Sequence, residues 1–166
     1  MDTAPHCLCP QQIALNLDAH GKTELLAAIA KALKAACRIE AEPILRALQR
    51  REQAASTAVG NRLAIPHARI PGIEAPVTMF ARTLSPIRFG SPDGQPVSEF
   101  FVILVPAEGA NEAHLELLRA VAELFSDAAF RATLAAATSA SAIADAFARW
   151  TGRTDCGDLA SLQGLS

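Results

Sequence analysis

The chain has 166 residues, of which 51% are hydrophobic and 19% are charged, and its formal net charge is −2. This composition excludes an intrinsically disordered chain and fits one domain with an apolar core. The slightly acidic balance excludes a broad electrostatic attraction for nucleic acid or for an anionic membrane.

The first residues, 1–6, lack the basic start and the apolar run of a signal peptide. The longest apolar stretches, such as 100–105, are far too short to span a membrane. We therefore expect a soluble cytoplasmic protein with no membrane insertion. Residues 1–20 show no clear periodicity and are interpreted as a tail that leads into a docking segment.

The four cysteines, Cys7, Cys9, Cys37 and Cys156, are scattered along the chain. The cluster His6-Cys7-Leu8-Cys9 suggests a metal site, but zinc sites usually need a second pair of ligands at a fixed spacing. The sequence contains no such second pair. We therefore expect reduced thiols and no bound metal.

Two helices are predicted in the first third of the chain. From Lys22 to Ala36, apolar side chains recur at three- and four-residue spacing, as they do on one face of a helix. A second helix is predicted from Pro43, which suits the first turn of a helix, to about Glu52. A polar loop over residues 54–62 follows.

The middle of the chain is expected to form strands. Leu63–Ile65 predicts a short strand that Pro66 stops, and Val77–Leu84 alternates and contains β-branched and aromatic residues. Ser85–Pro96 holds three prolines and two glycines, which indicates a loop or a hairpin. Phe100–Val105 is apolar on both alternating faces, as is typical of a strand between helices that cover each side of a sheet. The sequence thus predicts an α/β sandwich.

The last part of the chain is predicted to be helical. Asn111 is placed to cap a helix that runs to about Phe125, and Asp127 is placed to cap the next helix. Apolar residues within 143–150 mark a final helix. No domain linker is visible, so we divide the chain into a tail and docking segment (1–20), one domain (21–150) and a C-terminal tail (151–166).

One histidine stands in surroundings that favour phosphate chemistry. His67 follows a short apolar run and Pro66, within a segment (56–70) that also offers hydroxyls, backbone N–H groups and arginine. An imidazole with the ordinary pKa of about 6.5 is largely a neutral nucleophile near neutral pH. In an extended stretch, Arg69 would project from the same side as His67 and bring a cation toward a bound phosphate. We expect His67 to carry phosphate; the alternative is an idle histidine at a strand end.

A second histidine, His114, would lie in the first turn of the helix that Asn111 caps. Unpaired N–H groups and the positive end of the helix dipole favour an anion there, and the dipole also favours the neutral imidazole. The alternative is a structural histidine that borders the apolar stripe of the helix.

Further groups that could reach a phosphate lie before His67. Ser56 and Thr57 could donate hydroxyls or N–H groups to an oxyanion, and Arg50 or Arg51 could reach a phosphate or simply form the solvated end of a helix. The chain lacks a nucleotide-binding loop and the common hydrolase motifs. Nucleotide chemistry is therefore not expected.

Several short motifs follow one another in a characteristic order: Ser56-Thr57-x-x-Gly60, Ala64-Ile65-Pro66-His67, Phe89-Gly90, Gln95-Pro96-Val97, Leu104-Val105-Pro106-Ala107 and His114-Leu115. In these motifs the chain resembles, from about Lys22 to Trp150, the enzyme IIA family of the phosphoenolpyruvate-dependent phosphotransferase system, in its fructose, mannitol and nitrogen-related branch. It departs from the family where Ala68-Arg69 replaces a frequent Gly-Lys, although the arginine keeps the charge. It also has Ala58-Val59-Gly60 in place of Gly-Ile-Gly.

The resemblance implies that His67 is phosphorylated at Nε2 and that His114 is a second active-site histidine that supports the phosphoryl group. It places Arg51, Ser56 and Thr57 along the same site. It implies a mixed central β-sheet with helices packed on both faces. It also implies that no cofactor is needed, because the donor, an HPr-like phosphohistidine protein, is already activated.

A free-standing IIA protein resembles the nitrogen-related regulatory type, which signals through its phosphorylation state. Its targets would be other proteins, with a potassium transporter or a sensor kinase suggested by the resemblance. One alternative is a IIA subunit of a fructose- or mannitol-type permease that passes phosphate to IIB. Two others are a phosphodiesterase that uses His67 and His114, and a protein-binding module without phosphorylation.

Overall fold

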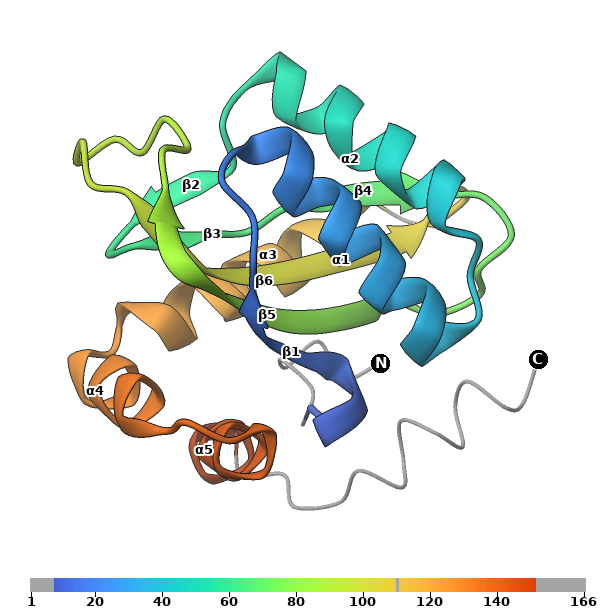
Figure 1. Cartoon of the computed structure of the whole chain (residues 1–166). Coiled ribbons are helices and arrows are strands. Elements are labelled where there is room, and N and C mark those ends of the chain that lie inside the picture. The colour runs from blue at the N-terminus through green and yellow to red at the C-terminus, as the bar shows by residue number, and fades with distance from the viewer. Residues whose placement is uncertain (1–7, 110, 152–166) are drawn as a thin grey trace. The chain divides into compact units, whose positions relative to one another are not determined.

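A computed structural model of the chain describes residues 8–109 and 111–151 (Figure 1). Within the described part the chain divides into two compact units, one of residues 14–107 and one that combines residues 8–13 with residues from 108 onward. The elements are, in chain order, η1 (Pro10–Gln12), β1 (Ile13–Leu17), α1 (Lys22–Cys37), α2 (Ala41–Ala54), β2 (Ala58–Gly60), β3 (Leu63–Ala64), β4 (His67–Ile70), β5 (Val77–Ile87), β6 (Val97–Pro106), α3 (Asn111–Ser126), α4 (Ala128–Ala136) and α5 (Ala140–Thr151).

The strands form one mixed sheet in the order β1-β5-β6-β3-β2, and β4 also pairs with β6. β5 runs antiparallel to β6, whereas β3 and β4 both run parallel to it. β3 lies opposite the first half of β6 and β4 opposite the second half, with Ile65 and Pro66 between them. Because proline has no N–H to donate, the pairing is interrupted there, and His67 begins the next strand.

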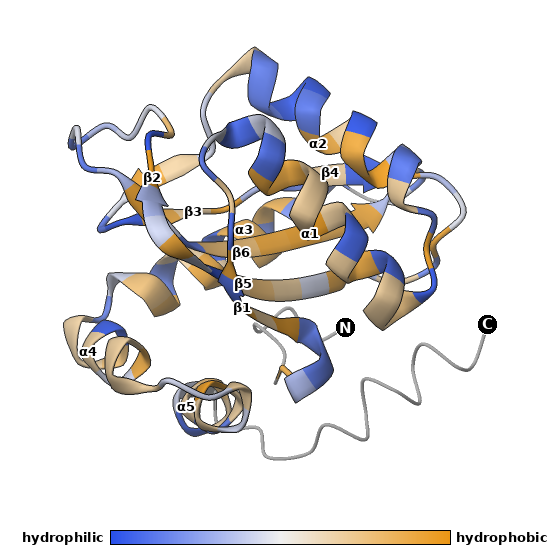
Figure 2. Ribbon diagram, in the orientation of Figure 1, coloured by the Kyte–Doolittle hydropathy of each residue, from blue (hydrophilic) through white to orange (hydrophobic). Residues whose placement is uncertain are grey.

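In the unit of residues 14–107, α1 and α2 pack side by side over one face of the sheet (Figure 1). Figure 2 shows the apolar side of both helices turned toward the strands and the hydrophilic side turned outward. This pattern follows from the three- and four-residue spacing of their apolar residues. The buried side chains that form this core include Leu25, Ile29, Leu33, Ile44, Leu48, Phe100, Val102 and Leu104.

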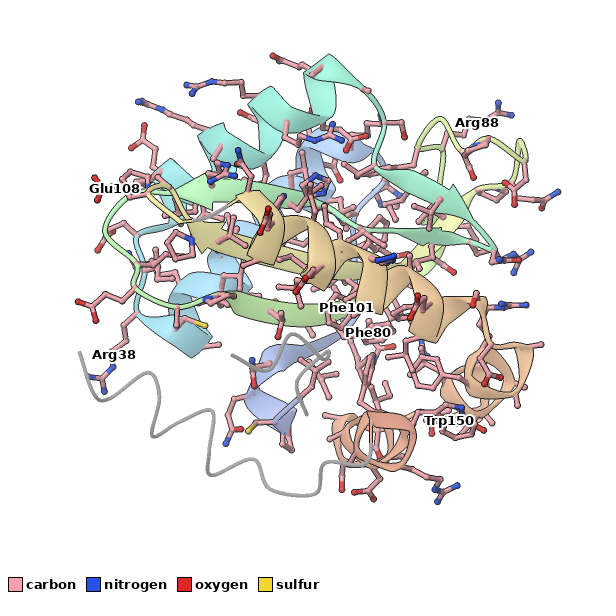
Figure 3. The ribbon with its side chains drawn as sticks, turned by 180° about the vertical axis from the view of Figure 1, so that it is seen from behind. Arg38, Phe80, Arg88, Phe101, Glu108 and Trp150 are labelled. Atoms are coloured by element: carbon pink, nitrogen blue, oxygen red, sulfur yellow. The ribbon has the colours of Figure 1, made fainter. Side chains whose placement is uncertain are left out.

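The alternate side chains of β6, Phe101, Ile103 and Val105, are buried as well, so both faces of this strand are covered as predicted. Phe101 lies opposite Phe80 of β5 in the sheet (Figure 3). A strand that is apolar throughout therefore marks the centre of the sheet.

The second unit holds α3, α4 and α5. The rings of Phe125, Phe130 and Phe147 meet edge to face, with centroids 5.2 to 6.0 Å apart, and Trp150 lies 5.5 Å from Phe130. Asp127 caps α4, as predicted, by accepting hydrogen bonds from two backbone N–H groups in its first turn.

The structure is an α/β fold with a mixed sheet, as the sequence predicts. The predicted helices and the central strands are present, but the polar loop 54–62 contains β2, and residues 1–20 contain β1. β5 continues to Ile87, beyond the predicted start of the loop at Ser85. α3 begins at Asn111, the residue that was predicted to cap it.

His6, Cys7 and Cys156 lie outside the described residues, as does the C-terminal tail from residue 152. In the part of the chain that the structure describes, no group of three histidine, cysteine or acidic side chains is arranged to hold a metal ion. Over the same residues, no helix has the length and apolarity needed to cross a membrane.

Candidate functional site

His67 is the first residue of β4 and its side chain is half-buried. Its ring nitrogen Nδ1 lies 2.7 Å from the carbonyl oxygen of Ile65. Since a carbonyl oxygen only accepts hydrogen bonds, the proton belongs on Nδ1. The other nitrogen, Nε2, is therefore the one with a lone pair available for bonding.

Arg51, in the last turn of α2, contacts that second nitrogen. Its Nε–H donates a hydrogen bond of 3.1 Å to Nε2 of His67, and its Nη1 donates one of 2.9 Å to the carbonyl oxygen of Ala55. The guanidinium is thus held at two points. The helix end and the strand start bring together a neutral imidazole and a fixed cation, which suits an anion bound at Nε2.

The surroundings keep this imidazole neutral. Burial is the main cause that lowers the pKa of His67 below its ordinary value of 6.5, and the positive charge of Arg51 lowers it further. The hydrogen bond to Ile65 and the negative charge of Glu52 act in the opposite direction on the same pKa. The net lowering favours the unprotonated, nucleophilic ring at neutral pH.

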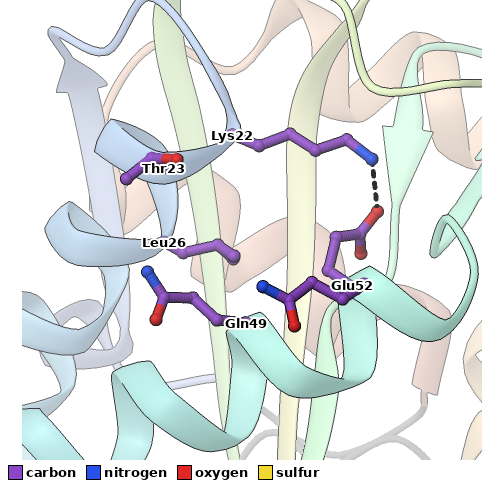
Figure 4. A pocket seen from close by; sticks show the side chains of 6 residues that line it. Lys22, Thr23, Leu26, Gln49 and Glu52 are labelled. Atoms are coloured by element: carbon purple, nitrogen blue, oxygen red, sulfur yellow. Dashed lines mark hydrogen bonds and ion pairs between the residues drawn. The ribbon is translucent and has the colours of Figure 1, made fainter.

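Directly behind this pair lies Glu52, whose side chain is 5% exposed. Its carboxylate accepts hydrogen bonds from the backbone N–H of Thr57 at 3.2 Å, from the Thr57 hydroxyl at 2.6 Å and from Nζ of Lys22 at 2.9 Å. Lys22 is the first residue of α1, and Figure 4 shows its ammonium reaching across to Glu52. One buried carboxylate therefore joins the start of α1, the end of α2 and the loop that leads to β2.

A pocket of 370 Å³ opens between these two helix ends (Figure 4). Its lining consists of polar side chains and one leucine: Lys22, Thr23, Leu26, Gln49, Glu52 and Gln53. The pocket lies on the side of Glu52 that faces α1, and His67 is not among its lining residues.

The hydroxyls predicted to face a phosphate are engaged within the loop. Ser56 Oγ donates to the carbonyl oxygen of Phe89 at 2.5 Å and accepts from the N–H of Ala58 at 3.2 Å. The Thr57 hydroxyl donates to Glu52. Both side chains therefore hold the backbone beside His67 in place.

The two remaining predicted residues are positioned differently. Arg69 lies on the same face of β4 as His67, as the alternation of the strand requires, and it lines a pocket with residues of α2. His114 lies half-buried in the first turn of α3, in the other compact unit. The structure thus brings together His67, Arg51 and the loop of Ser56 and Thr57.

Glu52 and Lys22 were not predicted as part of the site. Glu52 follows the buried residues Ile44 and Leu48 at four-residue spacing, so the sequence places it on the buried stripe of its helix. A buried carboxylate needs hydrogen-bonding or charged partners, and this requirement could have drawn attention to Glu52 from the sequence. Nothing in the sequence indicates the contact between the carbonyl of Ile65 and His67, since the direction of that carbonyl depends on the backbone conformation at Pro66.

Comparison with known proteins fixes the family. The sequence model described as "Phosphoenolpyruvate-dependent sugar phosphotransferase system, EIIA 2" matches residues 7–150. The chain belongs to this family. The match confirms the resemblance seen in the motifs, and the EIIA domain covers both compact units.

Some relatives of this EIIA chain are named nitrogen regulatory proteins, and others are named components of sugar phosphotransferase systems. The chain is 36% identical over 137 residues to a nitrogen regulatory protein of Pseudomonas aeruginosa, with 82% of this chain and 88% of the relative covered. It is 32% identical over 139 residues to a fructose-specific EIIABC component of Bacillus subtilis, with 83% of this chain but 22% of the relative covered. The crystal structure of the nitrogen regulatory protein IIA-Ntr from Neisseria meningitidis matches with a TM-score of 0.78 at 33% identity, covering 85% of this chain and 96% of that one.

Proposed function

We propose that this EIIA protein carries a phosphoryl group on Nε2 of His67, which it accepts from the phosphohistidine of an HPr-like protein. The observation that carries the proposal is the fixed pair of ring contacts. Ile65 holds the proton on Nδ1, and Arg51 meets the lone pair of Nε2. An idle histidine at a strand end would need neither the cation nor a lowered pKa.

The transfer exchanges one P–N bond for another. The lone pair of Nε2 attacks phosphorus in line, the P–N bond of the donor breaks, and its electron pair returns to the donor's imidazole. The proton on Nδ1 of His67 stays in its hydrogen bond to Ile65, so the ring can carry the positive charge that the new bond creates. Arg51 exchanges its contact with Nε2 for the phosphoryl oxygens, where a charge-assisted hydrogen bond is stronger.

The other predicted residues take supporting roles in this proposal. Ser56 and Thr57 hold the loop, through Phe89 and Glu52, and thereby fix the backbone that borders the phosphoryl group. Arg69 adds positive charge from the same face of β4. His114 donates a hydrogen bond to the phosphoryl group, as the family resemblance implies, and no cofactor or metal takes part.

We further propose a regulatory role in nitrogen-related signalling, in the cytoplasm, rather than sugar transport. The support is that the chain is 36% identical to the nitrogen regulatory protein and 32% identical to the fructose-specific component, and that IIA-Ntr matches its fold with a TM-score of 0.78. Phosphorylated His67 would add negative charge to a surface that partner proteins read. A potassium transporter and a sensor kinase are the partners that we would test.

The second candidate is a IIA subunit that passes phosphate to the IIB component of a fructose- or mannitol-type permease. The name of the Bacillus subtilis relative favours it. Transfer from the phosphorylated chain to a purified fructose-type IIB would support this candidate and contradict a purely regulatory role.

The intact mass of the protein tests the phosphocarrier proposal. Incubation with phosphoenolpyruvate, enzyme I and an HPr-like carrier should add one acid-labile phosphoryl group to the wild type and to His20→Ala, which replaces an exposed histidine. His67→Ala should gain none, and phosphorus NMR should place the group on Nε2. A gain that survives in His67→Ala, or no gain in the wild type with any of several carriers, would overturn the proposal.

A further inference from the structure

A second pocket lies on the outer side of α2, next to β4. Its volume is 360 Å³ and its lining consists of Glu42, Pro43, Arg46, Ala47, Arg50, Arg69 and Pro71. Glu42, Arg46 and Arg50 follow one another at four-residue spacing and therefore share one face of the helix. Figure 2 shows that the outer side of α2 is hydrophilic along its length. Arg69 joins this face from the strand that carries His67.

The lining of this pocket is positively charged although the whole chain is slightly acidic. Three arginines against one glutamate leave an excess of two positive charges, whereas the chain carries −2. Glu42 forms an ion pair with Arg46, which offsets one of the three cations. Of the other two arginines in the lining, Arg50 is exposed and Arg69 is half-buried. The pocket thus offers a local attraction for anions that the net charge conceals.

We propose that this pocket, lined by Arg46, Arg50 and Arg69, binds the carboxylates of an acidic segment of a partner protein. Arg46 and Arg50 are one helical turn apart, about 5–6 Å, which matches the spacing of about 7 Å between alternate side chains of an extended segment. One carboxylate of the segment can pair with Arg50, and another can replace Glu42 at Arg46, because the Glu42–Arg46 ion pair is exposed and therefore weak.

The pocket suits a protein segment better than a small phosphorylated ligand. Its walls include Pro43 and Pro71, which have no N–H groups to donate to a phosphate. Nucleic acid is disfavoured because it needs a longer basic track than three arginines. The apolar rings of the two prolines would instead pack against the aliphatic parts of a peptide.

The position of Arg69 connects this pocket to His67. The two residues lie on the same face of β4 with one residue between them, about 7 Å apart, which is within the Debye length of about 8 Å at physiological salt. A phosphoryl group on His67 lowers the positive potential at Arg69 and weakens the binding of an acidic segment. This step, unlike the binding itself, rests on the proposed function.

A hexaglutamate peptide titrated into the unphosphorylated full-length chain tests the proposal, with backbone amide NMR shifts as the readout and a hexaglutamine peptide as the control. We expect shifts around residues 42–50 and 69–71, weakening as salt is added. The double variant Arg46→Gln/Arg50→Gln should bind about tenfold more weakly, a loss of about 1.4 kcal/mol. The matched variant Lys31→Gln/Arg88→Gln removes the same charge from exposed positions outside the pocket and should bind like the wild type.

Equal weakening in both double variants, or shifts elsewhere, would overturn the proposal and indicate nonspecific charge attraction. Tighter binding of inorganic phosphate or pyrophosphate than of the peptide would assign the pocket to small oxyanions instead.

A second experiment tests the coupling to His67. The chain is first phosphorylated, which its intact mass verifies, and should then bind the peptide more weakly. Equal binding of the peptide to the phosphorylated and the unphosphorylated chain would contradict the coupling between the pocket and His67. If the chain accepts no phosphate, the proposed function fails, while the result with the unphosphorylated chain still decides the pocket.

Discussion

The Nε–H of Arg51 donates a hydrogen bond of 3.1 Å to Nε2 of His67, the ring nitrogen that the Ile65 carbonyl leaves with a lone pair. The unphosphorylated site therefore keeps its cation on the atom where we propose that phosphorus bonds. In the proposed transfer the guanidinium moves from the nitrogen to the phosphoryl oxygens. Ala55, which holds the far side of the guanidinium, limits that movement.

Arg51→Lys should slow phosphorylation of His67. Lysine keeps the charge but loses the planar group that meets His67 and Ala55 together, so a charge-assisted hydrogen bond worth about 1.5–3 kcal/mol is lost. We expect a rate about 10- to 100-fold lower, measured as the time course of the phosphorylated mass. Arg50→Lys, on the neighbouring exposed position, is the control and should keep the wild-type rate. A wild-type rate in Arg51→Lys would remove Arg51 from the site.

The pKa of His67 should be lower than the ordinary histidine value of about 6.5. Burial is the main cause of the lowered pKa, and the charge of Arg51 adds to it. Arg51→Gln should therefore raise the pKa of His67 without restoring it fully, because burial remains. A ring-proton NMR titration measures both values. A pKa of His67 at or above 6.5 in the wild type would contradict this reading of the site.

The same lowered pKa makes stability depend on pH. Between the pKa of folded His67 and 6.5, the unfolded chain binds more protons at this position than the folded chain. The contribution of His67 to the free energy of unfolding is thus present above about pH 6.5 and is lost as the pH falls through the folded pKa. Urea unfolding at pH 7.5 and 5.0 should show a larger loss for the wild type than for His67→Gln. An equal loss in both proteins would contradict the sign.

The helices and central strands were predictable because their patterns are long. The helical spacing from Lys22 onward and the apolar run of 100–105 each repeat a local rule over several residues, and tertiary packing reinforces them. β2 has three residues and β1 five, with half-buried or polar positions among them, so neither carries enough alternation to be recognised. The conformation of β1 depends on its pairing with β5, far along the chain, and that of β2 on its pairing with the short neighbouring strand β3.

The contacts among the residues of the candidate site could not be predicted from the sequence. The motifs indicated His67, Arg51 and the loop of Ser56 and Thr57, and the structure brings these together. The sequence could not predict that the Thr57 hydroxyl donates a hydrogen bond to Glu52, because that contact depends on where the end of α2 meets the loop. For the same reason, the sequence could not predict that the hydroxyls of Ser56 and Thr57 bond to groups within the protein and do not point outward toward a phosphate.

Glu52→Gln should destabilise the protein and loosen the loop beside His67. The amide loses the charge that Lys22 and Thr57 contact, and it must place an N–H₂ group where donors already point. We expect a loss of about 1–3 kcal/mol in the free energy of unfolding, from urea denaturation. A double-mutant cycle with Lys22→Met should give a coupling of about 0.5–3 kcal/mol between the two residues.

Glu42→Gln is the matched control, since Glu42 also lies on α2 and also forms an ion pair, but with an exposed partner. Such pairs contribute about 0–1 kcal/mol. Equal losses for the two substitutions would mean that burial of Glu52 adds nothing to the strength of its contacts.

Gly90→Ala should destabilise the loop that Ser56 contacts through Phe89. Gly90 has φ +73°, and an added Cβ would lie 3.5 Å from Cβ and Oγ of Ser56, an ordinary contact distance. The cost therefore comes from the left-handed backbone and is about 1–2 kcal/mol, and Gly90→Asn should cost less because asparagine tolerates this conformation. Gly21→Ser is the control: Gly21 precedes α1 with extended backbone and no atom near its Cβ position. Urea denaturation should show no loss for Gly21→Ser, and an equal cost for alanine and asparagine at position 90 would instead point to crowding against Ser56.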